Sequence, residues 1–155
     1  MTLTKLEVAS RQLDAAIRLF LEGDHLASLT LAGAAEEILG RLCERAGKPV
    51  AIEQIIAFHW EDTDPALPDA ERRKILIEIL NRARNAAKHA NDPDEIDFSV
   101  ESDFPLQMIM RAMPMARLLG APPSGEAKMV RWIREHPGAT TGGMDQQPRA
   151  KGAHT

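Results

Sequence analysis

A long stretch of sequence begins near Pro68 and closes with Arg84-Asn85-Ala86-Ala87-Lys88-His89. The pattern over 68–90 predicts a single helix, because proline is tolerated at a helix start and acidic residues favour its positive end. Apolar residues recur at three- and four-residue steps, at Ile75, Leu76, Ile79, Leu80, Ala83 and Ala87. The end of this helix therefore carries more polar chemistry than a packing helix needs.

The same spacing of apolar residues predicts further helices on both sides of this stretch. They span about 4–22, 25–46, 51–59, 103–119 and 124–135. Gly33 and Gly40 lie on nearly one face of the second helix, and each glycine costs roughly 1 kcal/mol against alanine, so a close approach by a neighbouring helix is expected. The helix at 103–119 is apolar almost all round, which predicts a central position in the bundle or in an oligomer interface.

The predicted fold class is all-α: an up-and-down bundle of four to five helices with a short C-terminal helix and a disordered tail. A length of 155 residues indicates one domain, and only 4% of residues are aromatic, which suits helices packed on helices better than sheets. We expect a helical bundle domain over 1–136. The Gly-, Pro-, Thr- and Gln-rich segment 137–155 is expected to be disordered.

Charge and cysteine content restrict the class of protein. A net charge of −4 argues against a protein that coats nucleic acid through bulk electrostatics, although a local basic site is compatible with it. The one cysteine, Cys43, excludes a disulfide within the chain and lies on an apolar run. No signal peptide and no run of transmembrane length is visible, so a cytoplasmic protein without membrane contact is predicted. No Gly-rich phosphate loop is present, and no cofactor is predicted.

The candidate site lies at the end of the helix predicted over 68–90. Asn85 and His89 are four residues apart and share a face, while Arg84 is about 140° around the axis from His89. Histidine exchanges a proton near neutral pH, and arginine offers fixed donors to charge that grows on phosphorus. Lys88 adds to a locally basic helix, because residues 69–89 contain six Lys or Arg and only three Asp or Glu. The set indicates phosphodiester chemistry without a metal.

Arg-Asn-x-x-x-His, late in a long helix of an all-helical domain, resembles the signature of the HEPN superfamily. The resemblance covers about 4–119. It implies a helical bundle, commonly a homodimer, that is either a metal-independent endoribonuclease of toxin–antitoxin, anti-phage or RNA-processing systems or a phosphate- or nucleotide-binding domain. It implies catalytic roles for Arg84 and His89 with Asn85 in support, and an acidic residue from an earlier helix, either Glu36 or Glu37. An RNA or nucleotide ligand and an antitoxin-like protein partner are implied in the same way.

Three other interpretations stay open. In the first, Arg84 and Lys88 belong to a solvated face, and His89 caps the helix C-terminus. In the second, the chain is a non-catalytic interaction or dimerisation module that assembles through its Met-rich helix. The third is a metal site built from His25, His59, Glu36, Glu37 and Asp62, but no Glu-x-x-His pair supports it and no metal is predicted.

Overall fold

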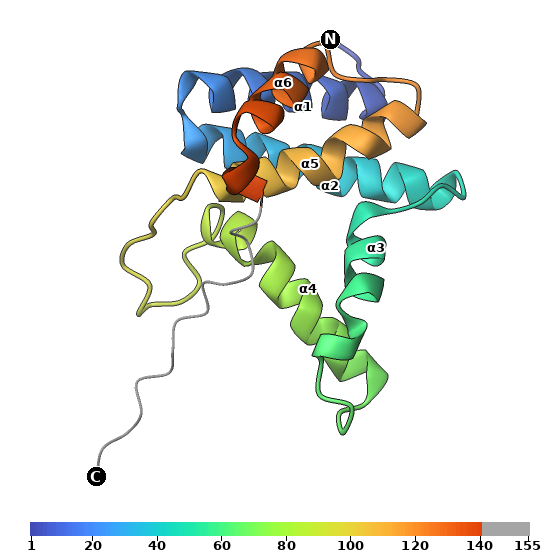
Figure 1. The fold of residues 1–155 in the computed structure, drawn as a ribbon, viewed down its shortest axis with the longest axis vertical. Helices are drawn as coiled ribbons and strands as arrows, with labels where there is room; N and C mark the ends of the chain where they lie inside the picture. Colours follow the sequence, from blue (N-terminus) through green and yellow to red (C-terminus); the bar gives the residue numbers. More distant parts are fainter. Residues whose placement is uncertain (141–155) are drawn as a thin grey trace.

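Six α-helices, two short 3-10 helices and no strand make up residues 1–140, which are the part of the chain that the computed structural model describes (Figure 1). The elements are α1 (Lys5–Glu22), α2 (His25–Arg45), α3 (Ala51–Phe58), η1 (Trp60–Asp62), α4 (Asp69–Ala86), α5 (Asp103–Leu118), α6 (Glu126–Glu135) and η2 (Pro137–Thr140). The predicted all-α helical bundle is confirmed.

Helices α1, α2, α5 and α6 pack into one body that contains the hydrophobic core (Figure 1). The apolar stripe predicted for the first helix is the buried face of α1, with Leu13 and Ala16 fully buried. Nine of the 16 residues of α5 are buried, which confirms the predicted central position of this helix. Met108, Met113 and Met115 of α5 lie in the core, whereas Met110 is 38% exposed.

The ends of the first two helices follow the expected capping rules. Thr4 Oγ1 accepts a hydrogen bond from the backbone N–H of Glu7, and the Glu7 carboxylate accepts one from Thr4 N–H, which forms a capping box. Gly23 ends α1 with φ of 88°, a conformation that favours glycine, and Asp24 then caps α2. The tight α1–α2 turn places the two helices side by side, so α2 is fixed in the body.

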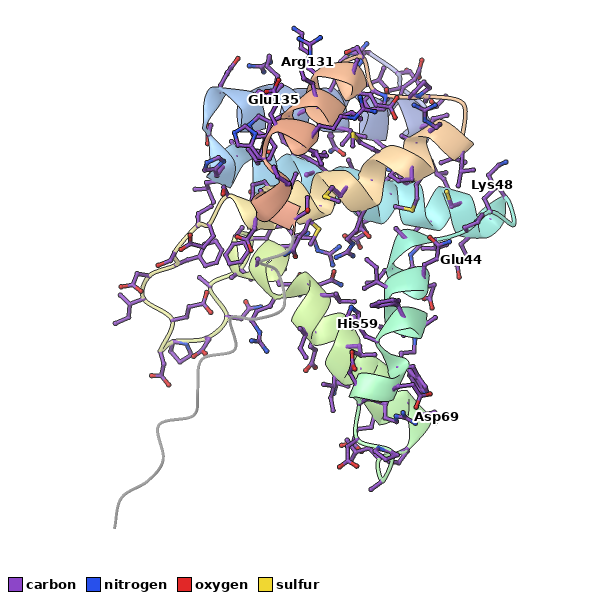
Figure 2. All side chains as sticks on the ribbon, in the orientation of Figure 1. Glu44, Lys48, His59, Asp69, Arg131 and Glu135 are labelled. Atoms are coloured by element: carbon purple, nitrogen blue, oxygen red, sulfur yellow. The ribbon has the colours of Figure 1, made fainter. Side chains whose placement is uncertain are left out.

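Helices α3 and α4, with η1 between them, form an arm that extends away from the body (Figure 1). Figure 2 shows Asp69, the first residue of α4, at the far end of this arm. In α4 only Leu76 and Asn81 are buried, and Ile75 and Ile79 are 37% and 43% exposed. The predicted apolar stripe is thus only partly buried, because α4 leaves the body instead of packing along it.

The C-terminal segment 137–155 is only partly described by the structure. Part of the segment predicted to be disordered, Pro137–Thr140, forms η2, and Ala139 packs against the core. Residues 141–155 of that segment lie outside the described part of the chain. Over residues 1–140, no helix is long and apolar enough to cross a membrane.

Cys43, which lies on an apolar run of the sequence, is fully buried, and this burial raises the pKa of its thiol.

The pair Glu53–Arg73 ties α3 to α4 and gives the arm a pH-dependent stability. Arg73 donates to both Glu53 oxygens, with 2.7 Å from Nη1 to Oε2, and these bonds hold the pKa of Glu53 below its ordinary value. A lowered folded-state pKa means that the pair stabilises the fold above the ordinary carboxyl pKa and ceases to do so as pH falls through the folded-state pKa. Both side chains are nearly half exposed, 48% and 44%, so solvent screens the pair.

We expect Glu53→Gln to lower the free energy of unfolding by about 0.5 kcal/mol at pH 7 and by less near pH 3. Thermal unfolding of wild type and variant at both pH values measures this difference. The exposed carboxylate Glu61 of η1 provides the control, since Glu61→Gln removes the same charge from the same arm. An equal loss at both pH values would show that the ion pair is not the cause.

Candidate functional site

A polar cluster lies where α2, α4 and α5 meet, and it consists of Glu36, Glu37, Asn81, Arg84, Lys88 and Arg111. Four of these six were predicted from the sequence as site residues, namely Arg84, Lys88, Glu36 and Glu37. The fold brings these four together from α2 and α4. Glu36 is 4% exposed, so its charge lies inside the protein and requires partners there.

Arg84 reaches back from α4 to the two neighbouring glutamates of α2. Its Nη1 lies 3.3 Å from Glu36 Oε2 and 3.9 Å from Glu37 Oε2, and its side chain is 12% exposed. Lys88, in the turn that follows α4, has its Nζ 3.9 Å from Glu37 Oε2. The Arg84 Nε atom is buried without a hydrogen-bond partner among the described residues. The arginine is thus fixed at one end of its guanidinium and not saturated with acceptors.

Gly33 makes the room through which Arg84 passes. A Cβ atom at this position would lie 2.6 Å from Arg84 Cγ and 2.7 Å from Cδ, closer than van der Waals contact allows. The predicted close approach at Gly33 is therefore real, although it comes from a side chain rather than a helix backbone. At Gly40, in contrast, the nearest atom is Val50 Cγ1 at 3.7 Å, which is ordinary contact.

Asn85 and His89, the other two predicted site residues, do not join the cluster. Both are exposed, and neither side chain makes a hydrogen bond or ion pair within residues 1–140. Helix α4 ends at Ala86, so the prediction of a helix to residue 90 is wrong by about one turn. The N–H of His89 still donates to the Asn85 carbonyl at 3.0 Å, which keeps the turn wound but leaves the ring beyond the helix.

The direction of each side chain follows from its position around α4. Arg84 and Lys88 are four residues apart and both lie near Glu37 of α2, whereas Asn81, three residues before Arg84, contacts Arg111 of α5. His89 lies beyond the end of α4 and is exposed. Arg84 donates to Glu36 of α2, so its guanidinium is directed toward the body, and the joint site expected for Arg84 and His89 stays a prediction.

Two members of the cluster, Arg111 and Asn81, were not predicted from the sequence. Arg111 is 6% exposed, and its Nη2 donates to Glu36 Oε1 at 2.7 Å and to Asn81 Oδ1 at 3.1 Å. The signal for Arg111 was present, since it is a cation in the middle of the apolar helix α5. Asn81 gave a weaker signal, because an amide beside the locally basic end of α4 is equally compatible with solvent.

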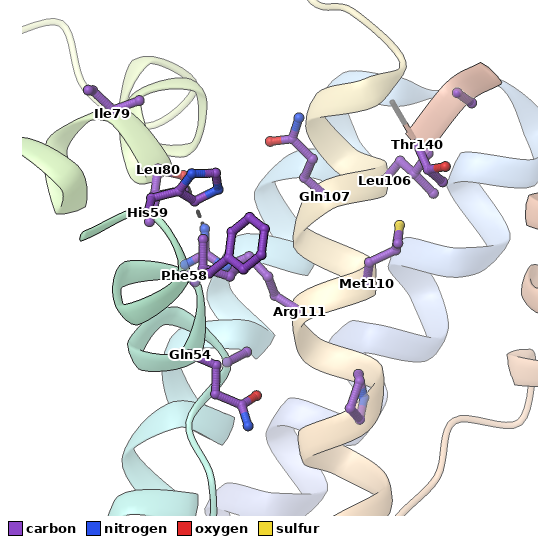
Figure 3. Close-up of a pocket in the computed structure, with 14 residues that line it drawn as sticks. Gln54, Phe58, His59, Ile79, Leu80, Leu106, Gln107, Met110, Arg111 and Thr140 are labelled. Carbon is purple, nitrogen blue, oxygen red and sulfur yellow. Dashed lines mark hydrogen bonds between the residues drawn. The ribbon is translucent and has the colours of Figure 1, made fainter. Parts of the chain in front are cut away.

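A groove of about 550 Å³ opens on the other side of Arg111, between the arm and the body (Figure 3). Figure 3 shows Arg111 reaching from α5 toward Leu80 of α4, where the dashed line marks its 3.1 Å hydrogen bond to the Leu80 carbonyl. Most of the lining is apolar, with Ile79 and Met110 among it. Of the polar cluster, only Arg111 lines this groove.

The candidate metal residues are spread over the molecule. Within residues 1–140, no three His, Cys, Asp or Glu side chains are grouped so that they could hold a metal ion. His59 Nδ1 lies 2.8 Å from Asp62 Oδ2 on the arm, and Glu36 is bound to arginines in the body. These residues therefore do not form one ligand set.

A scan against protein-family models, a search of curated proteins and a search of solved structures found no match to this chain. The class defined by the structure is an all-α helical bundle with a buried arginine–glutamate cluster. The HEPN resemblance rests on the motif residues and stays a prediction.

We expect Gly33→Ala to lower the free energy of unfolding by about 1–2 kcal/mol, because the new methyl group displaces Arg84 from Glu36. Gly40→Ala is the matched control in the same helix, and we expect it to be neutral or to stabilise by up to about 1 kcal/mol. Urea denaturation of both variants measures the difference. Equal stabilisation by the two alanines would show that Arg84 does not need the space over Gly33.

Proposed function

We propose that the chain is an HEPN-like, metal-independent endoribonuclease whose site is built from Arg84 and His89, with Asn85 and Lys88 in support. The observation that carries the proposal is the 3.3 Å contact between Arg84 and Glu36. The resemblance implied an acidic residue from an earlier helix, and α2 supplies one beside the motif arginine. The antitoxin-like partner that the resemblance implies and the cytoplasmic location expected from the sequence remain predictions.

Each side chain has a defined role in this proposal. The exposed His89 ring accepts the proton of a ribose 2′-hydroxyl, and that oxygen bonds to phosphorus to give a 2′,3′-cyclic phosphate. The bond from phosphorus to the 5′ oxygen breaks, and the leaving 5′ oxygen takes up a proton from the His89 imidazolium or from water. Arg84 donates to the phosphoryl oxygens on which negative charge grows. Lys88 and Asn85 bind neighbouring phosphate oxygens. None of these steps requires a metal ion.

The proposed site is completed by a second copy of the chain. Arg84 donates to Glu36 of α2 and His89 lies beyond the end of α4, so in this proposal the two side chains of one chain do not act on one phosphorus atom together. In a symmetric pair, the ends of two α4 helices face each other, and His89 of one copy acts opposite Arg84 of the other. The homodimer is therefore part of the proposed mechanism.

Complementation between two inactive variants tests the proposal. We expect purified Arg84→Gln and His89→Gln each to lose cleavage of a labelled mixed-sequence RNA in the presence of a chelator. A mixture that exchanges subunits should recover about a quarter of wild-type activity, because half of the dimers are mixed and each mixed dimer has one intact site. Gel analysis of the labelled fragments measures this recovery.

Arg82→Gln is the control, because Arg82 is an exposed cation two residues before Arg84 and outside the polar cluster. It should cleave RNA like the wild type. RNA left intact by folded wild type would refute the enzyme, and activity that is lost in both variants but not recovered on mixing would refute the shared site.

A second candidate is a non-catalytic module that pairs with a copy of itself through the arm. The observation in its favour is apolar exposure around the groove, where Phe58, Ile79 and Met110 are 82%, 43% and 38% exposed. This surface also revises the alternative drawn from the sequence, since Met110 is the methionine of α5 that stays available for assembly while Met108, Met113 and Met115 are buried.

For this module, we expect Ile79→Glu to shift the protein from dimer to monomer without loss of helix content, because a carboxylate on an apolar contact carries a desolvation cost. Sedimentation velocity gives the mass, and circular dichroism gives the helix content. Glu78→Gln, a change at a neighbouring exposed position, is the control. A dimer that persists in Ile79→Glu excludes this surface as the contact.

A further inference from the structure

Arg111 is the most completely bonded charged side chain of the polar cluster. Its Nε and Nη2 donate to Glu36 Oε1 at 3.2 and 2.7 Å, its Nη2 also donates to Asn81 Oδ1, and its Nη1 donates to the Leu80 carbonyl. A buried guanidinium requires such partners, because an unpaired charge inside a protein is strongly unfavourable. These bonds hold Arg111 rigidly between α2 and α4.

The Glu36 carboxylate is divided between two arginines. Oε1 takes both hydrogen bonds from Arg111, and Oε2 takes the longer one, 3.3 Å, from Arg84. Two positive charges thus share one buried negative charge, which leaves one positive charge in excess. Glu37 lies 3.9 Å from Arg84, and its side chain is 56% exposed, so water screens its effect.

We infer that Arg111 is a positioning residue that allows Glu36 to hold Arg84 in place without neutralising it. Arg111 makes two hydrogen bonds to Glu36, one of them shorter than the single bond from Arg84. Arg111 therefore compensates most of the negative charge of Glu36, and Arg84 compensates the smaller part. Arg84 then keeps positive charge for an anionic ligand of the phosphate class. The inference rests on the proposed function, in which Arg84 binds phosphoryl oxygens.

Removal of the Arg111 charge has a specific consequence under this arrangement. Glu36 would then have Arg84 as its main cation and would draw it into a neutral pair. Arg84 would remain in the chain yet bind anions less well. A second change that removes the Glu36 charge would release Arg84 again, and a purely structural role for Arg111 predicts no such recovery.

The test uses the full chain with inorganic phosphate as the probe, followed through the side-chain N–H resonances of Arg84. We expect Arg111→Met to weaken phosphate binding about tenfold, the size of a charge-assisted hydrogen bond. The double variant Glu36→Gln/Arg111→Met should bind phosphate more tightly than Arg111→Met, because Arg84 is released from the pair. Arg111→Lys keeps the charge but loses several of the hydrogen bonds, so its binding should lie between that of wild type and that of Arg111→Met.

Two further variants make the result decisive. Arg117→Met is the matched control, because Arg117 is an arginine of the same helix with 67% of its side chain exposed, and binding should not change. Arg111→Gln retains a donor to Glu36 without the charge, so it replaces Arg111→Met if the latter does not fold, and the same loss is expected. Circular dichroism confirms the helix content of each variant.

The outcomes separate this inference from the proposed function. Wild-type phosphate binding that is absent, or that is unchanged by loss of the Arg111 charge, overturns the inference, and so does a double variant that stays weak. RNA cleavage that depends on Arg84 but not on Arg111 overturns the inference alone. The expected phosphate pattern in a protein that leaves RNA intact upholds the inference and refutes the nuclease.

Discussion

One buried carboxylate, that of Glu36, holds three helices at a common point. It lies on α2 and accepts hydrogen bonds from Arg111 on α5 and from Arg84 on α4. A charge that is 4% exposed cannot be left unpaired, so both arginines are constrained to reach it. This requirement explains why Arg84 passes through the space over Gly33 to reach Glu36. It also explains why the amide of Asn81 accepts a further hydrogen bond from Arg111.

The molecule combines a densely packed body with an arm that has little burial of its own. The body depends on the apolar faces of α1, α2 and α5, whereas α4 buries only Leu76 and Asn81. The arm is attached to the body through polar contacts at the end of α4 and through small apolar residues, such as Ala51 and Ala83, that pack against the core. Because those contacts involve Arg84, the fixation of the arm and the chemistry proposed for the site depend on the same side chain.

The sequence predicted a residue of the site only where that residue differed from the pattern of its neighbours. Arg84 and the two glutamates among the small residues of α2 did so, and they meet in the fold. Arg111 was overlooked because a single cation in an apolar helix does not show which partner compensates it. The joint action of Arg84 and His89 stays a prediction, while the direction of the long Arg84 side chain is decided by the buried glutamate to which it donates.

The sequence by itself determined the helices, most of their ends and the buried faces of α1 and α5, because these depend on spacing and capping within a few residues of chain. The end of α4 is the exception, since the chain leaves the helix one turn earlier than the pattern predicts. Only the tertiary structure decided that Glu36 is divided between Arg84 and Arg111, residues 48 and 75 positions away in sequence. Such a division depends on how α2, α4 and α5 cross, and no local pattern records the distance between side chains of helices that meet only in the fold.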